Sequence, residues 1–256
     1  MQSSYSLKDF PQITLDCTTS NLLPGQIDNL LFVLHSVAHV TNISLPLVGI
    51  RPVVIIIDPT KKNPTCYRSL QKIYLSSPPT RWCKMAYQFA HELCHYVIPS
   101  EVPFNLRWLE ESICELSSYY FLPKISKYWK RIGINLKTSD GELYYPFFTS
   151  YVEDDQKKAV SFDLASFCSS THTSSDLLKL IKDCEIRNMN THVANELLPI
   201  FKSHPKTWHA IPLLASINSN MSLEASLAEW IALSPEESHI GLQKIVRIFG
   251  GKISQQ

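Results

Sequence analysis

Two histidines four residues apart, with a glutamate beside the first, lie in one strongly patterned segment. The segment has the sequence HELCH at residues 91–95. Apolar residues recur around it at helical spacing, and Pro99 ends the pattern, so we expect a helix from about Thr80 to Ile98. Residues four apart lie on one face of a helix, one turn above the other. Both imidazoles can therefore reach a single tetrahedral metal ion.

The histidines of this segment are candidate metal ligands, and its glutamate is a candidate general base. His91 and His95 would bind the metal. Glu92, next to the first ligand, does not bind the metal in sites of this type but takes a proton from the attacking water. A catalytic zinc site also needs a third protein ligand and an open position for water.

A second helix that carries carboxylates is expected after a short loop. Its pattern runs from about Leu106 to Leu122, and we expect it to end before Pro123. Glu111 and Glu115 are four residues apart on this helix, so both can face the first helix. Either glutamate can supply the missing ligand.

These residues resemble the gluzincin metallopeptidases, which combine HExxH with a downstream glutamate ligand. The sequence WLEE at 108–111 is similar to their W-L-N-E segment, and EESICE at 110–115 is similar to their N-E-x-x-x-D motif. Both alignments imply that Glu111 is the third ligand and that Glu115 orients a ligating histidine. By spacing alone, Glu115 is the ligand in some families, so it stays the alternative. The resemblance covers about residues 50–123.

A second resemblance, within the same superfamily, is to the ImmA/IrrE metallopeptidases, cytoplasmic regulators that cleave repressors. The segment from Glu110 to Pro123 is similar to their E-x-x-A-N-x-F-A-x-x-L-L-M-P segment. Here Ile113-Cys114 replaces the Ala-Asn pair, and Cys94 replaces the glycine before the second histidine. An ungapped match would place Glu110 in the glutamate position.

The resemblance implies a zinc-dependent peptidase that uses one Zn²⁺ ion and acts on a peptide or protein substrate. Glu92 would be the general base for the attacking water. The alternative is a non-catalytic or regulatory zinc-binding module whose C-terminal helical half binds a partner protein. An intact Glu92 favours the first hypothesis, because a purely structural site has no use for that carboxylate.

The remaining pattern predicts an α+β fold with a small zincin-like sheet. We expect a helix at 26–40, a buried strand at Val53–Ile57 and an edge strand at Lys72–Ser76, where an extended peptide could add as a further strand. Residues 1–132 would form the catalytic domain, and 133–256 a mainly helical segment packed on it. Within the latter, loops are expected at 139–145 and 149–155, and helices at 175–184, 193–201, 222–233 and 236–249.

Composition excludes several other classes of protein. The net charge of +1 gives no overall field for nucleic acid or an anionic membrane. The apolar runs are too short to span a bilayer, and the N-terminus lacks the pattern of a secretory signal. The seven cysteines form no CxxC pair, so we expect reduced thiols and a cytoplasmic protein. The oligomeric state cannot be read from these features.

Overall fold

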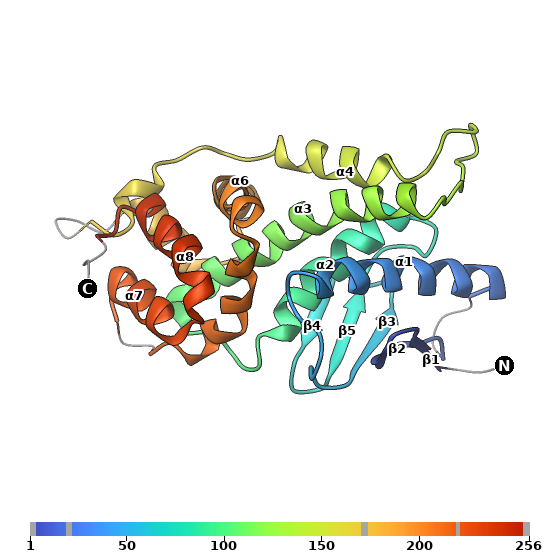
Figure 1. Ribbon diagram of the computed structural model, residues 1–256, viewed down its shortest axis with the longest axis horizontal. Helices are drawn as coiled ribbons and strands as arrows, with labels where there is room; N and C mark the ends of the chain where they lie inside the picture. Colours follow the sequence, from blue (N-terminus) through green and yellow to red (C-terminus); the bar gives the residue numbers. More distant parts are fainter. Residues whose placement is uncertain (1–3, 19–21, 170–173, 219–220, 253–256) are drawn as a thin grey trace. The chain divides into compact units, whose positions relative to one another are not determined.

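The computed structural model describes residues 4–18, 22–169, 174–218 and 221–252, which form an α+β structure that is mostly helical (Figure 1). In chain order its elements are β1 (Ser4–Leu7), β2 (Phe10–Asp16), α1 (Pro24–Asn42), β3 (Val53–Ile57), β4 (Thr65–Tyr67), β5 (Lys72–Leu75), α2 (Trp82–Val97), η1 (Phe104–Leu106), α3 (Arg107–Arg131), α4 (Phe147–Gln156), η2 (Leu164–Ser166), α5 (Ser175–Lys182), α6 (Arg187–Ser203), η3 (Pro205–Ser216), α7 (Leu223–Leu233) and α8 (Glu236–Ile248).

The chain divides into two compact units. One contains residues 1–97 and 117–154, and the other contains residues 98–116 and 155–256. Helix α3 contributes its first turns to the second unit and the rest to the first. The domain boundary expected near residue 132 stays a prediction, because this division is by packing and does not test which parts fold alone.

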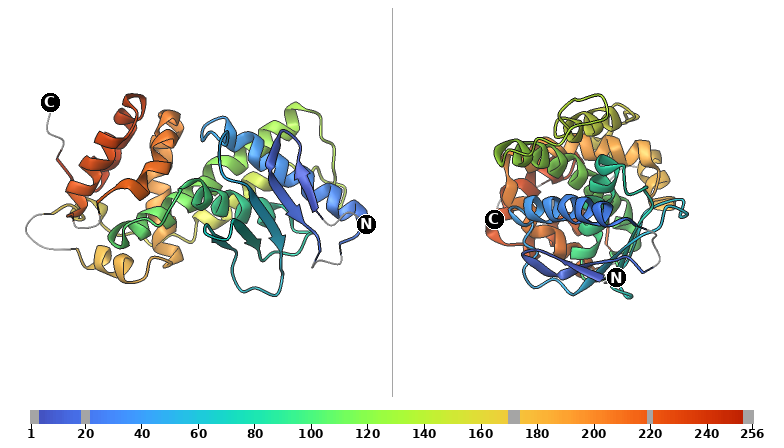
Figure 2. Two further views of the ribbon diagram at one scale, coloured as in Figure 1. Left: turned by 90° about the horizontal axis from the view of Figure 1, so that it is seen from below. Right: turned by 90° about the vertical axis from the view of Figure 1, so that its right-hand side faces the viewer.

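The first unit is built on a mixed five-stranded sheet. Its strand order is β1-β2-β3-β5-β4, with β2, β3 and β5 parallel to one another and both outer strands antiparallel to their neighbours. Helix α1 packs on β1 and β2, and α2 packs on β4 and β5, so both helices cover one face (Figure 2). In β5 the buried side chains alternate with partly exposed ones, whereas β3, in the middle of the sheet, has four buried side chains and one partly exposed one.

The expected edge strand lies inside the sheet instead. β5 begins at Lys72 as predicted, but it is paired with β3 on one side and with β4 on the other. The outer position belongs to β4, whose three residues are too few to show an alternating pattern. The prediction that Lys72–Ser76 offers a free edge to a peptide is therefore wrong, and β4 is the outer strand at that end.

The predicted end of the second helix before Pro123 is also wrong. Helix α3 continues through Pro123 to Arg131. A proline inside a helix costs about 3 kcal/mol, since it removes a hydrogen bond and crowds the preceding turn. Ile125 and Trp129 are both fully buried beyond it, and each buried side chain of this size contributes about 1.5–3 kcal/mol. Burial of the last two turns therefore offsets the cost of the proline.

Trp129 is held by a buried hydrogen bond that allows a test of this packing. Its indole Nε1–H donates to Ser36 Oγ on α1 at 2.8 Å. We expect Ser36→Ala to lower the free energy of unfolding by about 1–3 kcal/mol, because the indole N–H is left buried without this acceptor. The measurement is a urea denaturation curve for each variant.

Ser203→Ala is the matched control for Ser36→Ala. Both serines donate to the carbonyl of the residue four positions earlier, at 2.8 Å in each case, but Ser203 is exposed. Its removal should change stability by less than about 0.5 kcal/mol. Equal losses in the two variants would show that the Trp129 bond contributes nothing.

The second unit is helical apart from its connecting segments. Its core contains the large aromatic side chains of Phe201, Trp208, Trp230 and Phe249, all nearly fully buried. Helix α8 approaches η3 so closely that a Cβ on Gly241 would lie 1.8 Å from Thr207 Oγ1. The helices expected at 175–184, 193–201, 222–233 and 236–249 are present as α5 to α8. The loop expected at 149–155 is wrong, because these residues belong to α4.

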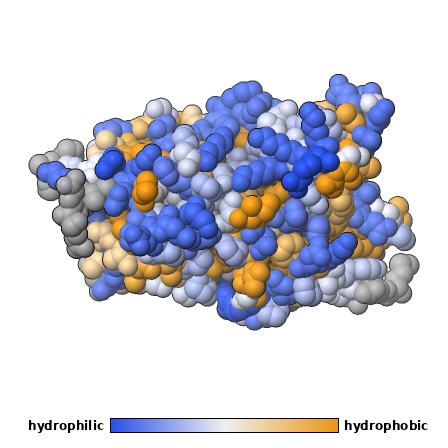
Figure 3. All heavy atoms as spheres, in the orientation of Figure 1, coloured by the Kyte–Doolittle hydropathy of each residue, from blue (hydrophilic) through white to orange (hydrophobic). Residues whose placement is uncertain are grey.

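The surface and the cysteines carry few special features. Hydrophilic side chains cover most of the face in Figure 3, and the apolar spots between them are separate. Across the described residues, no helix combines the length and apolar character needed to cross a membrane. All seven cysteines are free thiols.

Candidate metal centre

Helix α2 is anchored firmly to its surroundings. Gln88 Oε1 accepts hydrogen bonds from the backbone N–H groups of Ser76 and Ser77, each at 3.1 Å, which ties α2 to the segment after β5. On the other side, Ser117 and Ser118 of α3 donate to the carbonyls of Ala90 and Tyr87, each at 2.8 Å. These small polar residues bring the two helices close together. The result is a fixed helix for the HELCH segment.

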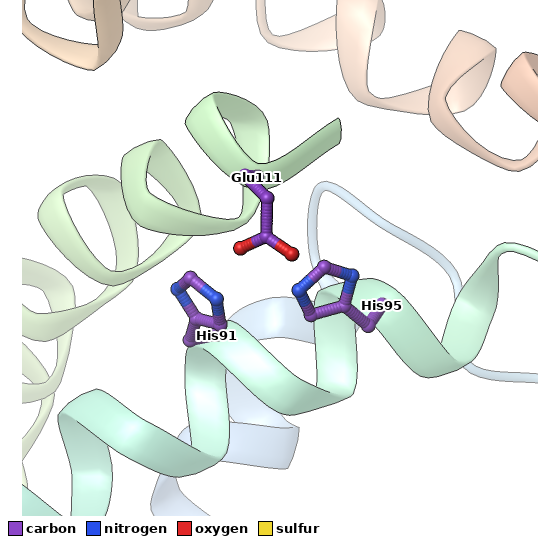
Figure 4. A group of neighbouring side chains, drawn as sticks. All are labelled: His91, His95 and Glu111. Atoms are coloured by element: carbon purple, nitrogen blue, oxygen red, sulfur yellow. The ribbon is translucent and has the colours of Figure 1, made fainter. Parts of the chain in front are cut away.

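The structure brings the two histidines together with Glu111. One possible ligand atom from each of His91, His95 and Glu111 lies within 4.8 Å of the other two. The imidazoles project from neighbouring turns of α2, and the Glu111 carboxylate is directed toward them from α3 (Figure 4). The ring centroids of the two histidines are 5.0 Å apart. The three side chains predicted as ligands thus converge on one point.

The three residues fit a metal ion that is bound by nitrogen and oxygen. Zinc binds imidazole and carboxylate at about 2.0–2.2 Å, which places tetrahedral ligand atoms about 3.3–3.6 Å apart. The ligand atoms lie within 4.8 Å of one another in this structure, so they would move closer together by up to about 1.2–1.5 Å when they bind the ion. His95 is buried, whereas His91 and Glu111 are partly exposed, so one side of the group remains open to solvent. Within the described ranges, the group contains three residues and thus leaves a tetrahedral position free.

Glu92, the predicted general base, is a buried residue of α2. It follows His91 on α2, and only 4% of its surface is exposed. In a site of this type the carboxylate would accept a proton from the water at the metal. Among the described residues, the group of candidate ligands does not include Glu92, and its role as a base stays a prediction.

Glu115 has a different environment from Glu111. Its carboxylate is 3.3 Å from Arg187 Nη2, and Arg187 also contacts Asp155 at 3.3 Å. Both acidic side chains are buried, while the arginine is largely exposed. Glu115 thus belongs to an ion-pair network of the second unit. This contact favours Glu111 over Glu115 as the ligand.

We expect Glu111→Ala to affect mainly zinc affinity and Glu115→Ala to affect mainly thermal stability. Glu111→Ala removes a ligand and should weaken zinc binding by more than about 100-fold with little loss of stability. Glu115→Ala should lower the melting temperature of the metal-free protein, because Arg187 loses a buried carboxylate partner. Glu115→Ala should weaken the zinc affinity by no more than about 10–100-fold. The measurements are a zinc competition titration and a thermal melt.

The reverse order of zinc affinities would identify Glu115 as the ligand. It would also show that the helical register proposed for the site is one turn wrong. A double variant that lacks both glutamates should bind zinc no better than Glu111→Ala alone.

The other residues singled out from the sequence lie outside the group. Glu110, the position given by the ungapped ImmA/IrrE match, is buried and is not among the clustered ligand atoms. Cys94 and Cys114 are both buried to at least 99% and are likewise outside the cluster. They occupy the interior side of their helices as small apolar residues.

One residue near the candidate site carries no signal in the sequence. Arg68 follows β4, and its Nε–H donates to the His95 carbonyl oxygen at 2.9 Å. No motif predicts this contact, because it depends on how a short strand packs against the end of α2.

Comparison with protein-family models, curated proteins and solved structures finds no match to this chain, so the evidence for the site comes from its own residues.

Proposed function

We propose that this chain is a zinc-dependent peptidase in which Glu92 is the general base. The observation that carries the proposal is the convergence of His91, His95 and Glu111 to within 4.8 Å. Two imidazoles four residues apart on one helix, with one carboxylate from the next helix, form a donor set of the kind found in catalytic zinc sites.

The donor set favours zinc over the common alternatives. Calcium and magnesium prefer oxygen ligands, whereas two imidazoles and a carboxylate suit zinc. When bound, zinc supplies a water whose pKa is lowered to about 7 and polarises the substrate carbonyl. A structural site would instead need a fourth protein ligand, and the cluster of described residues holds three.

The residues of the chain then have separate roles in hydrolysis. His91, His95 and Glu111 would hold the metal, and three protein ligands would leave a fourth position for water. Glu92 accepts a proton from the attacking water and returns it to the leaving amine, as a single base can do in both steps. Because Glu92 is buried, a hydrogen bond from the attacking water to its carboxylate would be stronger than in bulk water.

Strand β4 is the place where we expect an extended substrate to bind. It is one of the two outer strands of the sheet and packs against α2, the helix that carries both histidines. The outward backbone groups of an outer strand can pair with a peptide, which gives affinity without strict sequence preference. The substrate is therefore an extended peptide or an unfolded segment of a protein.

Metal removal and restoration test the proposal. Zinc-loaded full-length chain is incubated with a mixture of denatured proteins, and new amino termini are identified by mass spectrometry. We expect cleavage that stops after treatment with a chelator and resumes when zinc is added back. Cleavage that persists in the metal-free protein would contradict a zinc-dependent mechanism.

A further inference from the structure

Arg68 makes two contacts with the candidate ligand His95. Its Nε–H donates to the His95 carbonyl oxygen at 2.9 Å, and its Nη2 lies 3.5 Å from His95 Nδ1. The side chain is partly buried and comes from the residue that follows β4. A single guanidinium thus contacts both the backbone and the ring of the same histidine.

The backbone contact stabilises the end of α2. His95 lies in the last turn, where carbonyl groups have no partner within the helix. A cation that donates to such a carbonyl satisfies the acceptor and interacts favourably with the helix dipole. Arg68 therefore fixes the turn that carries His95.

The ring contact has a consequence for metal binding. A guanidinium can only donate hydrogen bonds, so a hydrogen bond at this contact requires Nδ1 as the acceptor and the ring proton on Nε2. A metal at Nε2 requires that proton to move to Nδ1, where it would face another N–H donor. A metal at Nδ1 uses the lone pair that accepts from Arg68. In either case the ring contact must be given up.

We propose that Arg68 is a positioning residue that fixes His95 in the metal-free protein and lowers the zinc affinity of the site. The proposal rests on the proposed zinc-binding function. Metal-ligating histidines usually donate their second N–H to a carboxylate, carbonyl or water, which stabilises the bound form. Arg68 offers a donor at this position instead of an acceptor, so it favours release of the metal.

Substitution of Arg68 by glutamine tests the proposal through zinc affinity. The amide N–H₂ of glutamine can donate to the His95 carbonyl, and its oxygen can accept from Nδ1–H. We expect Arg68→Gln to bind zinc about tenfold more tightly than the wild type, the lower end of the range for changes around metal ligands. The melting temperature of the metal-free variant should fall, because the charged cap of α2 is lost. If Arg68 had a purely structural role, the variant would show both a lower zinc affinity and a lower melting temperature.

Arg51→Gln is the matched control. Arg51 lies over the Tyr96 ring, 5.6 Å from its centroid, so its loss removes the same charge near the same end of α2. Because Arg51 is exposed, the zinc affinity of Arg51→Gln should stay within about threefold of that of the wild type. If the wild type binds zinc and Arg68→Gln binds it equally or less tightly, the inference about Arg68 is overturned, but the proposed function is not. A wild type that binds no zinc would overturn both this inference and the proposed function.

The tautomer of His95 gives a second test that needs no variant. Nitrogen NMR of the metal-free full chain at alkaline pH should show the ring proton on Nε2. Zinc addition should change the ring pattern of His95. A metal-free protein with the proton on Nδ1 would overturn the proposal, even if Arg68→Gln fails to fold.

Discussion

Glu92→Gln should abolish peptide hydrolysis and leave the zinc in place. Glutamine has nearly the same shape as glutamate, but its amide cannot accept the proton of the attacking water. The loss of a general base typically costs about 10²–10⁴-fold in rate, so cleavage should fall to the background of the assay. Because Glu92 lies outside the cluster of candidate ligands, zinc content should equal that of the wild type.

The matched control for this variant is Glu101→Gln. Glu101 lies shortly after α2 with a side chain that is 72% exposed, so the same change there should leave hydrolysis unaltered. The measurement is the rate at which new amino termini form, with zinc content determined on the same samples. Cleavage by Glu92→Gln at the wild-type rate would show that Glu92 is not the base.

His91→Ala and His95→Ala should each purify without zinc, whereas the wild type should hold about one zinc per chain. Two ligands are too few to retain the ion during purification, since most of the binding energy depends on the complete set. The measurement is metal content by mass spectrometry of the purified full chain. Both variants should also lose all cleavage.

His39→Ala is the control for the histidine variants. His35 and His39 have the same spacing on α1 as the two candidate ligands, but His35 contacts Asp9 at 3.2 Å and His39 stacks on Tyr128. Burial and the neighbouring His35 lower the pKa of His39. Zinc content should be unchanged in this variant. Full zinc retention in both His91→Ala and His95→Ala would place the metal elsewhere.

The parts of the fold that local sequence determines could be predicted. The run Val53–Ile57 is β3 with the predicted bounds, and the helix around HELCH is α2. Strand order depends on pairing between distant segments, so the interior place of β5 could not be read from residues 72–76. The alternation in FPQITLD at 10–16 was a usable signal for β2 that the sequence interpretation missed. The helix was predicted to end before Pro123 because local propensity does not include the burial of Trp129, which stabilises the turns beyond the proline.

In the candidate site, too, local spacing could be read from the sequence, whereas contacts between distant segments could not. Helical spacing indicated that His91 and His95 share a face and that a glutamate from the following helix could join them. Spacing could not separate Glu111 from Glu115, because both lie on the same face of α3. The difference lies in Arg187, a residue far along the chain that contacts Glu115. Arg68 was equally hidden, since its contact with His95 depends on the position of β4.

X-ray absorption spectroscopy of the zinc-loaded chain shows whether His91, His95 and Glu111 form an open, catalytic-type metal site. The spectrum reports the number and type of atoms bound to the metal. We predict two imidazole nitrogens and two oxygens at about 2.0–2.2 Å, one from Glu111 and one from water. No sulfur should be bound, because no cysteine belongs to the cluster of described residues. A sulfur ligand at about 2.3 Å, or a closed shell of four protein ligands, would contradict a catalytic site formed by His91, His95 and Glu111.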